Sequence, residues 1–242
     1  MQIKMIVCDL DGTLLRDDKT ISPRTLEILH RVKGLGIKFA IATARHALGS
    51  AAEHKAVLRP DAVIHIGGAE AKIGGKTVFS ASLADKTAWA LANAMLARGD
   101  ATRILAEGAD FFQSDFALDF PGPVYKVSAR FAKPLGDFGK NFDDVGIIQY
   151  RGEDLAAFTH SEARKWRAVQ ACADFFDIDT EEVAAFGDDA IDVEMLAKCG
   201  IGVAVANAVP QALAVAKYVC KCNEKDGVAV WLEENIVSDK RR

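Results

Sequence analysis

Short apolar runs alternate with helical patterns at the start of the chain. The runs at 3–8, 38–42 and 62–66 predict buried strands. After the first run, Ser22 and Pro23 are typical of a helix start, because Ser suits the N-cap and Pro suits the first helical position. Strands separated by helices indicate a parallel sheet with right-handed crossovers.

The pattern changes after residue 70. Gly74 and Gly75 predict a hairpin turn, and an Ala-rich helical stretch follows at 83–98. The next part has strand-like runs with no helical pattern between them, which favours an antiparallel α+β module. These runs cover 103–105, 124–131, 145–150 and 156–160.

The alternation of strands and helices returns after Ser161. Apolar runs at 183–186, 201–205 and 218–220 predict further strands of the first sheet. The sequence therefore predicts an α/β fold. We expect a Rossmann-like parallel-sheet core of residues 1–81 and 161–242, interrupted by an inserted α+β domain of residues 82–160.

Composition narrows the classes of function. The formal net charge is −4, so we expect no nucleic-acid partner. No segment approaches the roughly 20 apolar residues of a membrane span, and the apolar run before Asp9 is too short for a signal peptide. These features favour a cytoplasmic protein that has no membrane partner. The five cysteines are odd in number and scattered, which argues against a disulfide framework.

Two acidic clusters follow predicted strands. Asp9 and Asp11 come directly after the first strand, where alternate side chains of an extended chain project to one side, and Gly12 then allows a turn. Asp188 and Asp192 follow the strand at 183–186. Ligands of an open parallel sheet lie beyond the carboxyl ends of its strands, and neighbouring carboxylates repel unless a cation neutralises them. A hard ion such as Mg²⁺ suits oxygen ligands and leaves room for a phosphate.

Two further residues could bind that phosphate. Thr43 follows the strand at 38–42, and its hydroxyl, with the backbone N–H groups of Ala44 and Arg45, could hold phosphate oxygens. Lys165 supplies a cation. Each residue alone is more often an ordinary strand end or a solvated lysine.

The four elements in this order resemble the haloacid dehalogenase (HAD) superfamily of aspartate-nucleophile phosphatases. Residues 9–13 are similar to its DxDGT motif, residues 42–45 to its second motif, Lys165 to its third-motif lysine, and residues 187–192 to its GDxxxD motif. The insertion resembles a type IIB cap domain, and the motif order resembles the Cof-like subfamily. Residues 202–208 and 226–229 are also similar to that subfamily.

The resemblance implies a role for each residue. Asp9 would be the nucleophile that forms an aspartyl-phosphate, and Asp11 would act as acid and base. Asp9, the backbone carbonyl of Asp11, and Asp188 would hold Mg²⁺, with Asp192 in support. Residues 43–45 and Lys165 would bind the phosphoryl group. The partner would be a small phosphorylated metabolite such as a sugar phosphate, bound by a monomer or a homodimer.

Several positions depart from the subfamily pattern. Ile191 stands where Asn is usual, Gly67 lies in a segment that is usually Asn-Gly-Ala, Trp166 replaces Gly after the lysine, and Ala44 replaces Gly in the second motif. These changes leave the substrate open. Two alternatives to a phosphatase also remain: a phosphosugar mutase, for which Arg103, Lys126 and Arg130 could bind a second phosphate, and a catalytically weak phosphate-binding domain.

Overall fold

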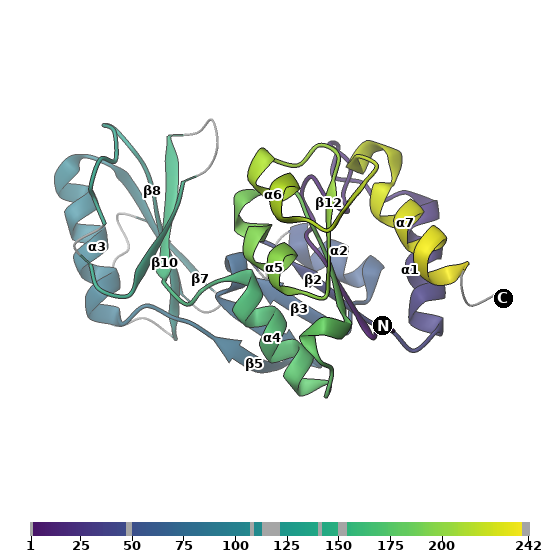
Figure 1. Ribbon diagram of the computed structural model, residues 1–242. Coiled ribbons are helices and arrows are strands. Elements are labelled where there is room, and N and C mark those ends of the chain that lie inside the picture. The colour runs from purple at the N-terminus through teal and green to yellow at the C-terminus, as the bar shows by residue number, and fades with distance from the viewer. Residues whose placement is uncertain are drawn as a thin grey trace. The chain divides into compact units, whose positions relative to one another are not determined.

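The computed structural model describes residues 2–46, 50–106, 109–112, 122–139, 142–149 and 154–238 (Figure 1). The chain forms two compact units: Met1–Phe79 with Lys165–Arg242, and Ser80–Arg164. The boundaries expected from the sequence were 81 and 161. Each unit is built around its own sheet.

The first unit has an eight-stranded sheet. Its strands are β1 (Met5–Cys8), β2 (Lys38–Ala42), β3 (Ala62–His65), β4 (Glu70–Ile73), β5 (Lys76–Ser80), β11 (Val183–Gly187), β12 (Ile201–Val205) and β13 (Tyr218–Cys220). They lie in the order β13-β12-β11-β1-β2-β3-β4-β5. All neighbours from β13 to β3 pair in parallel, and β4 runs antiparallel to β3. The predicted parallel α/β core is therefore confirmed.

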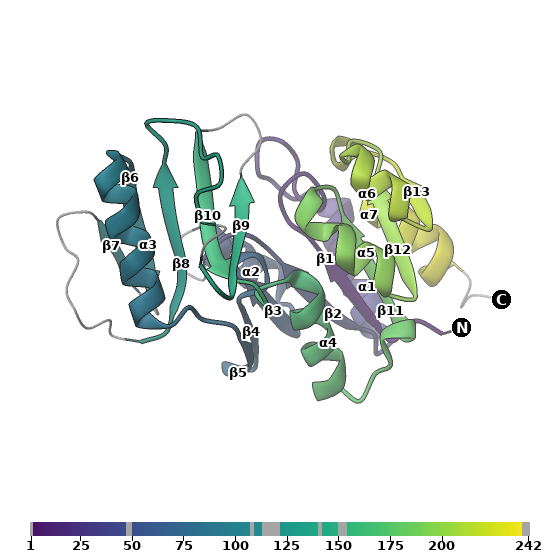
Figure 2. The same ribbon diagram turned by 60° about the vertical axis from the view of Figure 1, so that its left-hand side comes forward.

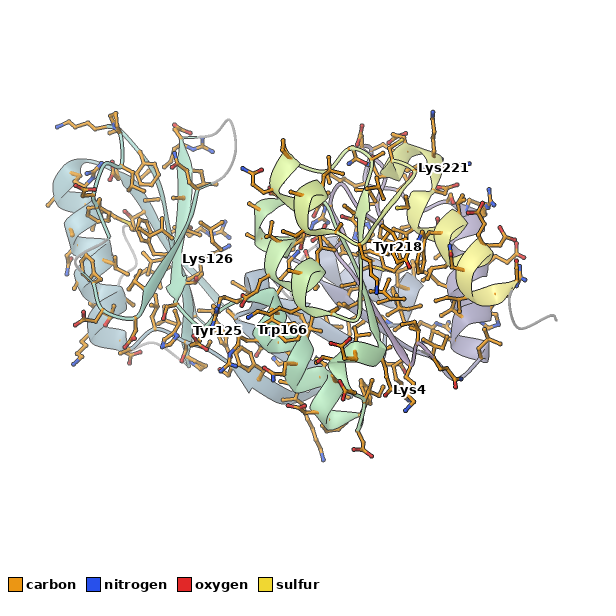
Figure 3. All side chains as sticks on the ribbon, viewed as in Figure 1. Lys4, Tyr125, Lys126, Trp166, Tyr218 and Lys221 are labelled. Atoms are coloured by element: carbon orange, nitrogen blue, oxygen red, sulfur yellow. The ribbon has the colours of Figure 1, made fainter. Side chains whose placement is uncertain are left out.

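Helices cover both faces of this sheet, which explains why its central strands are apolar throughout. The helices are α1 (Pro23–Gly34), α2 (Ser50–Leu58), α4 (Lys165–Phe175), α5 (Val193–Lys198), α6 (Pro210–Val215) and α7 (Gly227–Leu232). Helix α5 packs between α4 and α6, whereas α1 packs against α7, and the two groups lie on opposite faces (Figures 1 and 2). The ring of Tyr218, labelled in Figure 3, packs 5.9 Å from that of Trp231 on α7.

The second unit is an antiparallel sheet with one helix. Its strands are β6 (Ala101–Ala106), β7 (Ala109–Phe112), β8 (Val124–Arg130), β9 (Val145–Gln149) and β10 (Leu155–His160), in the order β7-β6-β8-β10-β9. Helix α3 (Asp85–Arg98) packs on β6 and β8 through Leu91 and Met95, which share a core with Val127 and Phe158 (Figure 2).

Two details differ from the sequence prediction. The sequence of residues 110–115 is typical of a loop, but Ala109–Phe112 form β7, which pairs with β6, and residues 113–115 lie outside the described residues. Strand β3 ends at His65, one residue earlier than predicted, because Ile66 has a φ of +53°, which is incompatible with a strand. The helical composition of residues 47–58, followed by Pro60, predicts a helix there; α2 begins at Ser50, and residues 47–49 of the predicted range lie outside the described residues.

None of the helices in the described part of the chain has the length and apolar composition that a membrane crossing requires.

Candidate active site

Three carboxylates converge at the carboxyl ends of β1 and β11. These strands are parallel neighbours, with Cys8 opposite Phe186, and the Asp9 N–H donates to the Phe186 carbonyl at 2.9 Å. Asp9 and Asp188 therefore leave adjacent strands at the same edge. Carboxylate oxygens of Asp9, Asp188 and Asp192 lie within 4.8 Å of one another. The structure thus brings together the two acidic clusters that the sequence singled out.

Lys165 lies inside this acidic cluster. It is the first residue of α4, its side chain is buried, and its Nζ donates at 2.6 Å to Oδ1 of Asp9 and at 2.6 Å to Oδ1 of Asp192. Burial works to lower the pKa of Lys165, but the carboxylates of Asp192 and Asp9 outweigh it and raise that pKa. Lys165 therefore stays protonated and holds two carboxylates in fixed positions.

One ammonium does not neutralise three carboxylates. Burial raises the pKa of Asp9 well above its usual value; Lys165 opposes this, and repulsion from Asp192 and Asp188 adds to it. Burial also raises the pKa of Asp188 to about 6, although its Oδ1 accepts a hydrogen bond from the Thr13 hydroxyl at 2.7 Å. The cluster thus has a surplus of negative charge that a further cation would relieve.

Asp192 differs from the other two acids in its contacts. Its Oδ1 binds Lys165, and its Oδ2 accepts from the backbone N–H groups of Asp188 and Asp189, each at 3.1 Å. It does not cap the first turn of α5 with its side chain. A buried carboxylate with these partners suits holding the Asp188 loop and Lys165 in place, which leaves Asp9 and Asp188 as the better oxygen ligands for an ion.

Two glycines make room for this arrangement. A Cβ at Gly187 would lie 2.5 Å from the Cβ of Asp192, and a Cβ at Gly12 would lie 2.5 Å from Asp188 Oδ2. Gly12 also has a φ of +79°, which side-chain-bearing residues rarely adopt. The atoms of this cluster that could ligate an ion are all carboxylate oxygens, and together they carry surplus negative charge. Gly12 and Gly187 leave space for these carboxylates because they have no side chain. The cluster therefore fits a hard divalent cation such as Mg²⁺.

Asp11 points to a different set of partners. Arg45 grips its carboxylate with two hydrogen bonds, Nε to Oδ2 at 2.7 Å and Nη2 to Oδ1 at 2.6 Å, and Lys19 Nζ lies 2.9 Å from Oδ1. Partial burial would raise the pKa of Asp11, but the hydrogen bonds from Arg45 and Lys19 outweigh it and lower that pKa. Arg45, expected on the phosphate, therefore binds Asp11 in this structure.

Thr43 lies at the end of β2 in a rigid turn. Its buried hydroxyl accepts from the Arg45 N–H at 3.0 Å, and its carbonyl accepts from the Gly67 N–H at 3.0 Å. The Ile66 N–H donates to the Arg45 carbonyl at 3.0 Å. Gly67 has a φ of +65°, so the glycine that departs from the family pattern suits this conformation. The two loops brace each other and fix the backbone of residues 43–45.

A family model described as haloacid dehalogenase-like hydrolase matches residues 6–116 and 124–232. The chain belongs to this family.

Two curated relatives that the chain matches over nearly its whole length carry phosphatase names. A 5-amino-6-(5-phospho-D-ribitylamino)uracil phosphatase of Bacillus subtilis is 27% identical, over 95% of this chain and 96% of its own length. A pyridoxal phosphate phosphatase of Escherichia coli is 24% identical, over 98% of this chain and 100% of its own length. A solved structure described as a subclass IIB sugar phosphatase superposes with a TM-score of 0.80 at 21% identity, over 96% and 98% of the two chains. The predicted family, fold and phosphatase class are confirmed.

Sequence reasoning missed the residues that brace the first motif of this haloacid dehalogenase-like hydrolase. Asn207 donates to the Gly12 carbonyl at 2.7 Å and accepts from the Asn223 N–H at 3.1 Å. Buried Asn223 donates to the Leu15 carbonyl at 3.1 Å, and Arg16 binds both carboxylate oxygens of Asp226 at 3.0 and 3.2 Å. Residues 207 and 226 belong to the two segments that resembled the subfamily, which was the available signal.

The second unit has its own pocket of about 640 Å³. It lies between the start of α3, residues 142–144 and His160, and contains no member of the acidic cluster. The basic residues considered for a second phosphate lie on neighbouring strands, Arg103 on β6 and Lys126 and Arg130 on β8, and Arg130 is ion-paired with Asp154.

Proposed function

We propose that this chain is a Mg²⁺-dependent phosphatase that hydrolyses a small phosphorylated metabolite through an aspartyl-phosphate at Asp9. The observation that carries the proposal is the convergence of the Asp9, Asp188 and Asp192 carboxylates, with Lys165 shared between Asp9 and Asp192. A carboxylate can attack a phosphate dianion only where cations offset their repulsion. Lys165 supplies one positive charge at 2.6 Å from Asp9, and the surplus negative charge of the cluster calls for another.

Asp9 is the nucleophile in this mechanism. Lys165 fixes its carboxylate through Oδ1, and an oxygen of that carboxylate forms the bond to phosphorus while the bond to the leaving oxygen breaks. Asp11 gives its proton to the leaving oxygen. It then takes a proton from the water that attacks the phosphorus, which restores the Asp9 carboxylate and releases inorganic phosphate.

Asp11 needs a change of partners to act as the acid. Arg45 and Lys19 lower its pKa and favour the ionised form, which suits the base step. A bound phosphoryl group that draws either cation away would favour the protonated form. The backbone N–H groups of residues 44–45, the Thr43 hydroxyl and Lys165 would hold the other phosphoryl oxygens.

Bound Mg²⁺ would supply positive charge for the transferring phosphoryl group. Asp9, the backbone carbonyl of Asp11, and Asp188 would hold it. Asp192 would keep Asp188 and Lys165 in place through the bonds it already makes.

The substrate class rests on the relatives. One is named a phosphatase of 5-amino-6-(5-phospho-D-ribitylamino)uracil and another a phosphatase of pyridoxal phosphate, and both compounds are small phosphorylated molecules. We propose that residues 82–160 serve as a type IIB cap that selects the leaving group.

Aryl phosphate hydrolysis tests the mechanism. Purified protein with Mg²⁺ should release phosphate from 4-nitrophenyl phosphate, and EDTA or Asp9→Asn should abolish the release. Asp174→Asn, an exposed carboxylate on α4, is the matched control and should keep full activity. Release that survives Asp9→Asn would refute the aspartyl-phosphate. Isomerisation of a sugar phosphate after priming with a bisphosphate would indicate a mutase instead.

A further inference from the structure

Lys19 contacts the Asp11 carboxylate from the solvent side. Its Nζ lies 2.9 Å from Asp11 Oδ1, and its side chain is 54% exposed. Arg45 already holds the same carboxylate through both of its oxygens. Because a bidentate guanidinium fixes a carboxylate by itself, Asp11 does not need Lys19 for its orientation.

The surrounding backbone nevertheless holds Lys19 in a conformation that a lysine seldom adopts. Lys19 has a φ of +66°, a left-handed conformation that residues with a Cβ seldom adopt. The Lys19 N–H donates to the Arg16 carbonyl at 2.9 Å, and the Arg16 N–H donates to the Thr20 carbonyl at 3.0 Å. Asp18 closes the turn by accepting from the Thr20 N–H at 2.9 Å. Unfavourable conformations that surrounding bonds maintain are concentrated at functional positions.

We propose that Lys19 binds a second anionic group of the substrate, located on the leaving group beside Asp11. This inference rests on the proposed function, in which Asp11 protonates the leaving oxygen. An exposed ammonium can turn from Asp11 to an incoming anion with little loss, because Arg45 still holds the carboxylate. The substrate class is then a phosphomonoester that carries another negative charge, from a carboxylate or a second phosphate, near the ester oxygen.

Matched ligand pairs test the subsite. One pair is 3-phosphoglycerate and glycerol 3-phosphate, which differ in a carboxylate. The other is 2,3-bisphosphoglycerate and 3-phosphoglycerate, which differ in a phosphate on the carbon next to the ester-bearing carbon. Each compound competes with 4-nitrophenyl phosphate in the presence of Mg²⁺, so that an inhibition constant is obtained whether or not it is hydrolysed. In at least one pair the wild type should bind the more anionic member about fivefold more tightly.

Three variants identify the residue responsible. Lys19→Met should remove the preference, and Lys19→Arg should keep it. Lys4→Met is the matched control: Lys4, labelled in Figure 3, is also an exposed lysine, 49% accessible and paired with Glu182 at 2.7 Å. It should leave the preference unchanged.

The alternatives give different results. If Lys19 only positions Asp11, Lys19→Met will lower kcat for every substrate and leave the ratio of inhibition constants unchanged, which would overturn the subsite. A wild type without preference in either pair would also overturn it. A wild type that hydrolyses no aryl phosphate would instead overturn the proposed function, and the subsite with it.

Discussion

Asp9 and Asp11 are two residues apart at the end of one strand, yet the fold gives them opposite surroundings. Asp9 is 5% exposed and shares a single ammonium with Asp192. The Asp11 side chain is 37% exposed and has two cations, Arg45 and Lys19, on its own carboxylate. The pKa of Asp9 is raised because burial dominates, and the pKa of Asp11 is lowered because its hydrogen bonds outweigh its partial burial.

This difference shows that access to water and the local count of charges decide what a carboxylate does. The carboxylate of Asp9 is buried and held in one position, and only nearby cations reduce its repulsion from a phosphate. A nucleophile requires both conditions. The half-exposed carboxylate can exchange protons with water and change partners, as a proton carrier requires. Four experiments test this division, from the largest expected effect to the smallest.

Removing the buried cation should have the largest effect. Lys165→Met leaves three neighbouring carboxylates without their ammonium, so kcat should fall on the order of 10³-fold. The free energy of unfolding without Mg²⁺ should fall by about 3 kcal/mol, measured by urea denaturation at pH 7. Lys198→Met, which breaks the exposed pair with Glu194, should cost less than about 0.5 kcal/mol. Equal stability of the two variants would contradict the account of the buried cluster.

Asp11→Asn should separate activity from stability. The variant loses the proton carrier, so kcat should fall on the order of 10²-fold. Its ion pairs are partly exposed and screened, so the free energy of unfolding should change by less than about 1 kcal/mol. Steady-state kinetics and urea denaturation of the same preparation measure both. A loss of stability as large as that of Lys165→Met would show that Asp11 belongs to the buried structure.

Magnesium affinity should depend on pH through the buried acids. Asp188 has a pKa of about 6 without metal, so below that pH a proton competes with the ion. We expect affinity measured by calorimetry to fall about tenfold for each pH unit below 6. The raised pKa also means that the stability from Asp188 is present below the unfolded value and is lost as pH rises through 6. Added Mg²⁺ should therefore raise Tm more at pH 7.5 than at pH 5.

Asp188→Asn is the control for this titration. The variant should bind Mg²⁺ weakly at every pH, and its Mg²⁺ affinity should depend on pH much less than that of the wild type. An affinity that stays constant between pH 7.5 and pH 5 in the wild type would show that these acids do not hold the ion.

Asn223→Ala should have the smallest effect on activity. It removes the bonds from Asn223 to Leu15 and Asp17, which brace the loop carrying Asp11 and Thr13. We expect kcat to fall about fivefold with KM unchanged, and the free energy of unfolding to fall by about 2 kcal/mol. Asn235→Ala removes a side-chain bond to the Trp231 carbonyl and should lower stability with no change in kcat. Equal kcat in the two variants would show that the brace is only structural.

The sequence by itself determined the α/β fold, the two acidic motifs and the family. These features depend on local patterns. Apolar runs of strand length predict the sheet, and acidic residues directly after a strand lie at the carboxyl edge, where parallel sheets bind ligands. Thr43 and Lys165 were also expected near phosphate, because the motif order resembled a known family. Strand β7 and the left-handed conformation of Ile66 were not predicted. Neither segment has an alternation of apolar and polar residues, or a turn motif, that distinguishes it from a loop.

Only the tertiary structure decided the partners of each charge. Lys165 reaches Asp9 across 156 positions of sequence and Thr13 reaches Asp188 across 175, and the pKa of each group follows from these contacts and from burial. No local pattern indicated that Arg45 would form two hydrogen bonds to Asp11. None indicated that Asp192 would bind Lys165 and two backbone N–H groups. Distance and access to water set electrostatic interactions, and both exist only once distant segments have packed together.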